Sequence, residues 1–150
     1  MKAMTPGVTG ATEGIENLSW SILGQTYVPK QISADSFAWH ATFGVGTFVP
    51  PHIHPLQDEF LYILEGRLDF WLDGVDASAA VGDLVRLPKG IPHGIFNNSG
   101  AIAKSLFWVA PTGRLVELFQ AIHDLPQQTP EAVVALAARY DVDFLPPPPA

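Results

Sequence analysis

The sequence predicts an all-β barrel or sandwich followed by one or two C-terminal helices, within a single domain. Between Leu18 and Pro111, short apolar runs alternate with Gly, Pro, Asn and Asp at the spacing of about 8 to 12 residues that is typical of all-β folds. After Pro111 the apolar residues recur with the period of a helix. The chain has 150 residues, of which 47% are hydrophobic and 15% charged, and this suits one compact core.

The N-terminal part divides into an arm and a barrel. Residues 1–14 are rich in Gly and Thr and are expected to form a flexible arm, whereas residues 15–112 are assigned to the barrel. Turns such as Glu65-Gly66 and Asp73-Gly74 supply residues that tolerate positive φ or cap a turn. Strands are expected over Leu18–Leu23, Ser36–Phe43, Thr47–His54, Glu59–Leu64, Arg67–Leu72, Ala77–Ala80, Leu84–Leu87, His93–Asn97 and Ala103–Val109.

Residues 113–145 are expected to form helices that pack outside the barrel. The segment Gly113–His123 is predicted to be amphipathic, with one face on the barrel. The apolar residues of that face are Leu115, Leu118, Phe119 and Ile122. A second helix is expected to begin at Thr129-Pro130-Glu131, because a Thr cap, a first-turn Pro and an early carboxylate all favour initiation. Its buried residues are expected to be Val133, Val134, Ala137 and Tyr140. Residues 146–150 are Pro-rich and are predicted to form an exposed tail.

Charge and composition argue against several functions. Eight Lys and Arg against fifteen Asp and Glu give a net charge of −7, so the chain would repel nucleic acids and anionic lipid surfaces. The absence of cysteine excludes disulfides, iron–sulfur clusters, Cys-based zinc sites and a thiol nucleophile. The sequence contains neither the apolar stretch of a signal peptide nor the ~20 apolar residues of a membrane span. We therefore expect a cytoplasmic protein with a small-molecule substrate and no nucleic-acid or membrane partner.

His52 and His54 are the first candidate metal ligands. Residues two apart in a strand point the same way, with Cα atoms about 6.6 Å apart, so the two imidazoles can converge on one ion. Pro50, Pro51 and Pro55 flank the pair. Because proline is confined to strand starts, edges or bulges, the pair is expected at a strand end near the barrel mouth.

The next strand begins with two carboxylates, Asp58 and Glu59, which must point to opposite faces. Glu59 is in phase with Leu61, and Asp58 with Phe60, so periodicity alone does not decide which one faces the interior. A further candidate is His93, which follows the rigid turn at residues 88–92.

These residues form a known pattern. The first motif of the cupin superfamily is resembled at every defining position by the stretch Gly46-(five residues)-His52-Ile53-His54-(four residues)-Glu59-(six residues)-Gly66. The second is resembled by Gly82-(five residues)-Pro88-Lys89-Gly90-(two residues)-His93-(three residues)-Asn97. The resemblance implies a cupin jelly-roll β-barrel with the metal ligands His52, His54, Glu59 and His93, and it favours Glu59 over Asp58. The motif glycines, Pro88 and Asn97 would then form turns.

A buried His is more often a hydrogen-bonded core residue, and we prefer that interpretation for His40 and His123, which lie outside the motifs. Asp58 and Gln57 are interpreted as rim residues. A closed structural zinc site is disfavoured because such sites are mostly Cys-rich. Three imidazoles and one carboxylate on a six-coordinate ion leave about two positions open for exchange. The set fits one divalent transition metal ion, namely Fe, Mn, Ni, Co, Cu or Zn.

The expected cavity beside the metal is apolar. Phe48, Leu61 and Ile95 are in phase with the ligands of their strands, and Phe107 or Trp108 is expected to join them. Such a lining suits a flat, weakly polar substrate with a chelating pair of oxygens. Within the cupins, a single domain with three His and one Glu resembles the quercetin-dioxygenase group, as does the stretch from His52 to Phe60.

The leading hypothesis is therefore a quercetin 2,3-dioxygenase-like oxidoreductase acting on an enol or phenol, such as a flavonol-like compound. Glu59 would be both a ligand and a general base, with a pKa raised by the apolar surroundings. One alternative is a non-redox isomerase, lyase or decarboxylase of a small carbonyl acid, and another is a non-catalytic ligand-binding cupin. A homodimer is also expected, because strands such as Phe60–Leu64 are apolar on both faces.

Overall fold

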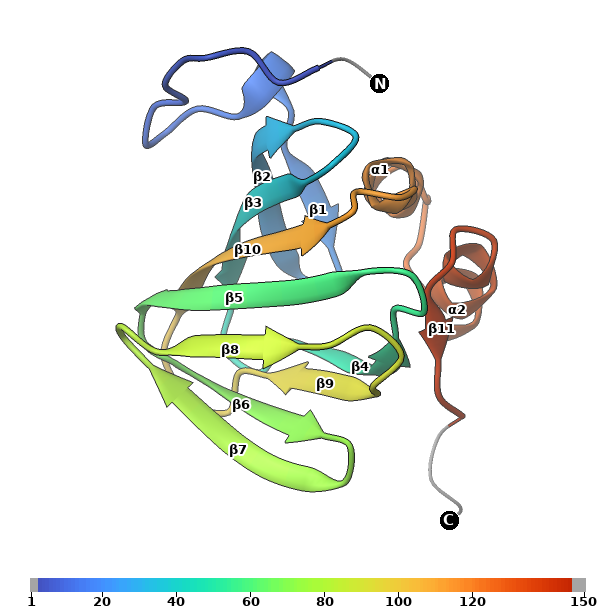
Figure 1. Ribbon diagram of the computed structural model, residues 1–150. Coiled ribbons are helices and arrows are strands. Elements are labelled where there is room, and N and C mark those ends of the chain that lie inside the picture. Colours follow the sequence, from blue (N-terminus) through green and yellow to red (C-terminus); the bar gives the residue numbers. More distant parts are fainter. Residues whose placement is uncertain (1–2, 147–150) are drawn as a thin grey trace.

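The computed structural model describes residues 3–146 and contains two antiparallel β-sheets with a core between them (Figure 1). The first sheet has the order β1-β2-β3-β10-β5-β8. Its strands are β1 (Trp20–Ile22), β2 (Gln25–Ile32), β3 (Phe37–Phe43), β10 (Ala103–Ala110), β5 (Asp58–Glu65) and β8 (Leu84–Leu87). The second has the order β11-β4-β9-β6-β7. Its strands are β11 (Asp143–Phe144), β4 (Phe48–Ile53), β9 (His93–Phe96), β6 (Arg67–Leu72) and β7 (Val75–Ala80). The expected all-β architecture with C-terminal helices is confirmed.

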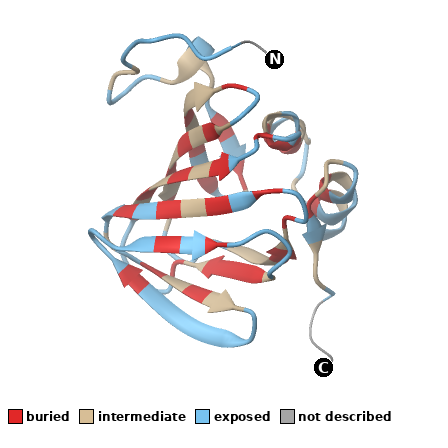
Figure 2. Ribbon diagram, viewed as in Figure 1, coloured by how far each residue is buried: buried red, intermediate tan, exposed pale blue. Residues whose placement is uncertain are grey.

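The strands alternate between buried and exposed residues, which is visible as colour changes along the ribbons in Figure 2. On β3 and β10 the inward residues include a row of stacked aromatic rings. The Trp39 ring lies 4.7 Å from that of Phe37 and 5.3 Å from that of Phe107, and Phe107 in turn lies 6.1 Å from Phe43. Burial of these large rings supplies much of the apolar area that drives folding.

The turn between β5 and β6 depends on Gly66. Its φ is +75°, and a Cβ atom there would lie 2.7 Å from the carbonyl oxygen of Ile102. Any other residue would therefore be strained and would collide with the neighbouring chain. The predicted role of this motif glycine as a turn residue agrees with this geometry.

The two helices, α1 (Leu115–His123) and α2 (Pro130–Ala138), lie together beside one edge of the barrel (Figure 1). The predicted apolar face of α1 is buried, and Thr129 caps α2 by accepting a hydrogen bond from the backbone of Ala132. Of the residues expected to be buried on α2, Val133 and Ala137 are buried, whereas Val134 is exposed. None of the helices in residues 3–146 has the length and apolar character needed to cross a membrane.

Side chains of the helical region complete the free edge of β1. Gln120 accepts a hydrogen bond from the Trp20 indole at 2.9 Å, and His123 Nδ1 accepts one from the backbone N–H of Ser21 at 2.9 Å. Gln128 accepts from the backbone of Leu23 and donates to the carbonyl of Ser21. These contacts hold α1 and the α1–α2 connection against the barrel.

Sequence analysis missed β2, which contains Pro29. The register between β2 and β3 shifts between Pro29 and Gln31, so the strand accommodates the proline at an irregularity. The short strand β11 was also missed. A single 3₁₀ turn, η1 (Ile15–Asn17), precedes β1.

The described part of the N-terminal arm, residues 3–14, contains no helix or strand but is tied to β2. Lys30 donates through its ammonium to the carbonyls of Gly10 and Glu13, and Thr9 donates to the carbonyl of Lys30. The predicted Pro-rich tail, residues 146–150, lies outside the described residues except for Pro146.

Candidate metal centre

The four candidate ligands come from both sheets and meet inside the barrel. His52 lies on β4 and His54 directly after it, whereas His93 is the first residue of β9 and Glu59 the second residue of β5. Register places His52 opposite His93 in the second sheet. All four side chains are buried. The strands therefore bring three imidazoles and one carboxylate together at one point.

The distances between these side chains are short. His54 Nε2 lies 3.7 Å from Glu59 Oε1, and His93 Nε2 lies 3.3 Å from Glu59 Oε2. The ring of His52 lies 4.3 Å from that of His93 and 5.0 Å from that of His54. One possible ligand atom from each residue lies within 4.8 Å of all the others. Two ligands on opposite sides of a zinc-sized ion are about 4.2 Å apart, so a small inward shift would complete a coordination shell.

Polar atoms of Glu59 and His93 lack hydrogen-bond partners within the described residues. Glu59 Oε2 and His93 Nε2 are buried and face each other without forming a hydrogen bond. Buried polar groups left unpaired are costly, so these atoms are suited to binding an ion. Three imidazoles and a carboxylate form a donor set suited to a divalent transition metal, and the residues present therefore fit a metal ion.

Burial determines the charge of these groups. It lowers the pKa of the His52 imidazole well below its usual range, and the neighbouring His93 and His54 lower it further. Burial also lowers the pKa of His54, although Glu59 opposes this effect. Both imidazoles are therefore neutral near pH 7, which is the form that binds metals.

The expected rise in the pKa of Glu59 is wrong. Burial alone would raise this pKa, but the adjacent His54 and His93 more than offset the effect, so the pKa lies below its ordinary value. The apolar lining expected from the sequence does not determine the pKa of Glu59, because the carboxylate of Glu59 faces imidazoles. Glu59 is therefore ionised at neutral pH.

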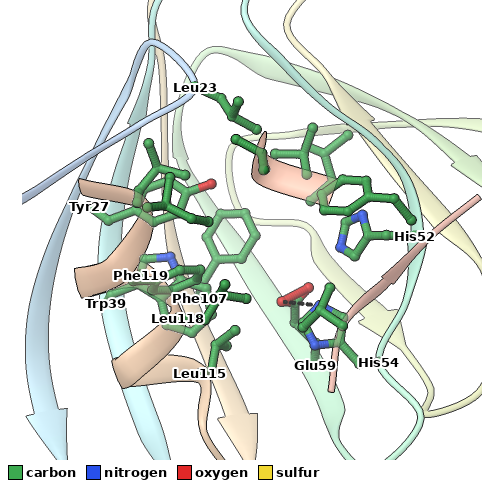
Figure 3. Close-up of a pocket in the computed structure, with 17 residues that line it drawn as sticks. Leu23, Tyr27, Trp39, His52, His54, Glu59, Phe107, Leu115, Leu118 and Phe119 are labelled. Carbon is green, nitrogen blue, oxygen red and sulfur yellow. Dashed lines mark ion pairs between the residues drawn. The ribbon is translucent and has the colours of Figure 1, made fainter. Parts of the chain in front are cut away.

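A cavity of about 50 Å³ is lined by three of the four residues, His52, His54 and Glu59. In Figure 3, His52, His54 and Glu59 lie on one side of it, and aromatic side chains, including those of Tyr27 and Phe119, lie on the other. Its remaining walls come from the barrel and the helical region and are apolar. They include Val49, Ile95, Trp39, Phe107, Leu115, Leu118 and Phe144.

Two of the four residues predicted to line a substrate cavity, Ile95 and Phe107, line this one, and two do not. Leu61 is fully buried in the core but does not reach the cavity. Phe48 is 49% exposed and stacks on Phe96 in a separate groove on the outer face of the second sheet, so that prediction is wrong.

An irregularity in β4 explains the position of Phe48. Val49 pairs with Ile95 and His52 with His93, so three steps along β4 match two along β9. The extra residue is a β-bulge at Pro50 and Pro51, and it reverses the alternation of side chains. Val49 rather than Phe48 therefore shares the inner face with His52.

Sequence analysis also missed functional neighbours. Tyr27 was not considered because its strand was not predicted, yet its side chain lines the cavity. Burial, and to a smaller extent the charge of Glu59, raises the pKa of its hydroxyl.

The interpretation of Gln57 as a rim residue is wrong. Gln57 is 5% exposed, and its Oε1 lies 3.0 Å from His54 Nδ1. A Gln three residues after a ligating His was the signal that could have identified it.

The other polar candidates lie apart from the centre. Asp58 is exposed, as expected for the rim, and accepts a hydrogen bond from the backbone of Lys89 at 2.9 Å. His123 accepts from Ser21, and His40 lies half-buried on β3. Neither His40 nor His123 belongs to the group of ligands.

Comparisons with known proteins agree with this geometry. The family model for the cupin domain matches residues 39–109, which contain all four candidate ligands. Among solved structures, the chain is similar to an RmlC-like cupin from Shewanella frigidimarina, with a TM-score of 0.63 and 19% identity over 73% of this chain and 94% of that one. This likeness confirms the cupin jelly-roll fold.

Curated relatives match only part of the chain. The tetracenomycin polyketide synthase protein TcmJ of Streptomyces glaucescens is 29% identical over 60% of this chain and 61% of its own length. Germin-like protein 9-1 of Oryza sativa is 36% identical over 43% of this chain and 29% of its own length. The matches thus span less than two thirds of either relative.

Proposed function

From the match of residues 39–109 to the cupin domain and from the cupin jelly-roll fold, we propose that the chain is a metal-dependent dioxygenase acting on a small, flat enol or phenol. The observation that carries this proposal is the convergence of three His and one Glu beside an aromatic cavity, whose wall includes His52, His54 and Glu59. A pocket lined by apolar rings, with its polar groups gathered at one end, binds a flat molecule and orients its oxygens toward those groups.

The ion would be held by Glu59 together with His52, His54 and His93. When bound, it would supply Lewis acidity toward the substrate oxygens and, for a redox-active metal such as Fe or Cu, reactivity with O2. The protein contributes the neutral imidazoles of His52 and His54, the negative charge of Glu59 and exclusion of bulk water, because all four side chains are buried.

Glu59 is the proposed proton acceptor. Its carboxylate is ionised at neutral pH, and Oε2 has no hydrogen-bond partner among residues 3–146. An enol or phenol hydroxyl placed beside it would lose its proton to Oε2, while the O–H electron pair stays on the substrate oxygen as an enolate or phenolate. The electron pair is shared with the far carbon of the enolate double bond, or with the ring carbon ortho to the phenolate oxygen, and that carbon is then electron-rich and open to attack by O2.

The residues that line the cavity also limit the class of substrate that can bind there. Among the residues that line the cavity within the described chain, His and Glu are the ionisable groups besides Tyr27, and no Lys or Arg is present to neutralise a phosphate. A sugar phosphate is therefore disfavoured. The name of TcmJ points to polyketides, whose alternating carbonyl groups enolise readily and chelate cations.

A second candidate is a non-redox, metal-dependent isomerase, lyase or decarboxylase of a carbonyl compound. The similarity to a polyketide synthase protein favours it, because polyketide assembly forms carbon–carbon bonds between carbonyl compounds without consuming O2. The same deprotonation by Glu59 would start either reaction.

Oxygen uptake separates the candidates. The untagged protein is first analysed for bound metal and then supplied in an oxygen electrode with a 1,3-diketone, catechol or quercetin. Uptake of O2 matched by product supports the dioxygenase. Product formed equally fast without O2 supports the non-redox enzyme, and binding without product over long incubation supports a ligand-binding cupin. A protein that binds no divalent metal would refute the proposal.

A further inference from the structure

Gln57 occupies a buried position between a candidate metal ligand and the start of the helical region. It lies directly before β5. Its Oε1 is 3.0 Å from Nδ1 of His54, and its Nε2 donates to the carbonyl of Pro111 at 3.0 Å and to that of Thr112 at 2.6 Å. The two contacts with Pro111 and Thr112 join segments that are more than fifty residues apart in sequence.

These contacts fix the orientation of the Gln57 amide. Its two N–H donors are both used by carbonyl oxygens, and a flipped amide would set its own oxygen against those oxygens. Oε1 must therefore face His54, and it can only accept. Nδ1 of His54 must then carry the proton, which leaves Nε2 with a free lone pair directed toward Glu59, 3.7 Å away.

We propose that Gln57 is a positioning residue that sets the tautomer of His54, so that Nε2 is presented to the metal ion. The inference rests on the metal binding proposed above but not on the reaction that follows. His52 has an independent partner of the same kind, because its Nδ1 lies 2.7 Å from the carbonyl of Pro50. Such outer partners typically contribute about 10–100-fold to metal affinity.

The carbonyls that orient Gln57 are themselves held in place. Thr112 is fully buried, its N–H donates to the carbonyl of Ala34 at 3.2 Å, and its hydroxyl donates to the carbonyl of Ser33. Next to it, Gly113 has a φ of +55°, and a Cβ there would lie 3.1 Å from Gln57 Nε2. A larger residue at this position would therefore crowd the amide of Gln57.

The same segment leads into α1, which forms part of the cavity wall through Leu115, Leu118 and Phe119. The segment that orients Gln57 is therefore continuous in sequence with the helix that lines the cavity.

The first test uses the wild-type protein without metal. Two-dimensional NMR of ¹⁵N-labelled histidine near pH 7.5 distinguishes protonated from free ring nitrogens. We expect His54 to be protonated at Nδ1 and free at Nε2. A proton at Nε2 of His54, or a mixture of tautomers, overturns the proposal whether or not the protein binds metal.

The second test replaces Gln57 by Met, which keeps the size but removes the hydrogen bonds. In Gln57→Met, His54 should show mixed tautomers while His52 remains protonated at Nδ1, and Zn²⁺ affinity measured by competition with a chelator should fall about 10–100-fold. Asp58→Asn is the matched control, with wild-type affinity. An unchanged His54 tautomer with unchanged affinity would show that Gln57 merely pins the loop, and the proposal would fail. If Gln57→Met does not fold, the wild-type spectrum decides.

Discussion

Glu59 supplies the negative charge of the site. Replacing Glu59 by Gln keeps the shape of the side chain but removes the charge that balances a divalent ion among three imidazoles. We expect Glu59→Gln to fold, to bind metal at least about tenfold more weakly, and to lose turnover even when metal is added in excess. Metal content and turnover are measured separately. If metal content and turnover both stay at wild-type values, Glu59 is not part of the site.

At the scale of residues, the sequence located all four candidate ligands but not their surroundings. The spacing of His52, His54 and Glu59 repeats a motif, so their convergence could be predicted. Phe48 was misplaced because alternation was counted through the bulge at residues 50–51, which shifts the phase by one. The spacing from His54 could have identified Gln57, but the orientation of its amide could not be predicted, because its partners Pro111 and Thr112 lie more than fifty residues away.

At the scale of elements, α1 limits the cavity. Phe119 reaches from this helix onto the rings of Tyr27 and Trp39, each 5.1 Å away. The resulting space of about 50 Å³ holds at most a few water molecules, so a flat aromatic substrate requires α1 to shift or Phe119 to turn aside.

Phe119→Ala tests this limit. The variant should lose about 3–5 kcal/mol in the free energy of unfolding, because it leaves a cavity in a packed aromatic cluster. If it folds, it should bind 1-naphthol more tightly than the wild type, as measured by quenching of tryptophan fluorescence. Glu117→Ala, on the exposed side of the same helix, should change neither quantity. Lower stability without tighter binding would mean that Phe119 does not restrict the cavity.

The elements themselves were mostly predictable. Strands flanked by Gly or Asp turns and the helix that begins at Thr129 were located, because local signals and tertiary packing agree there. The strand containing Pro29 was not, because proline disfavours a strand and the irregular register with β3 that tolerates it depends on tertiary pairing. β11 has two residues and forms by pairing with β4, which no local pattern reveals.

At the scale of the whole molecule, the expected homodimer stays a prediction. The helices cover one edge of the barrel, while Tyr62, Leu64 and Leu84 remain exposed on the outer face of the first sheet. Light scattering at micromolar concentration should give the mass of a dimer, and Leu64→Glu should lower it to that of a monomer. Val8→Glu, an exposed residue of the arm, is the control. A wild-type monomer would contradict the prediction.

Acid should destabilise the metal-free fold through its buried imidazoles. Burial lowers the pKa values of His52 and His54 in the folded state, whereas in the unfolded chain they lie near 6.5. Below pH 6.5 the unfolded chain therefore binds protons that the folded protein excludes, and stability falls as the pH falls. Glu59, whose folded pKa is also lowered, adds a further loss below about pH 4.5.

Thermal unfolding with a chelator present, followed by tryptophan fluorescence between pH 8 and pH 4, measures this dependence. We expect a constant Tm above pH 7 and a progressive decline below pH 6.5. His52→Gln should weaken the decline between pH 6.5 and pH 5, because it removes one of the two buried groups that the unfolded chain protonates. The metal-loaded protein should decline more steeply, since protons compete with the ion for the same imidazoles. A Tm that rises on acidification would contradict the assignment of these imidazoles as buried and neutral.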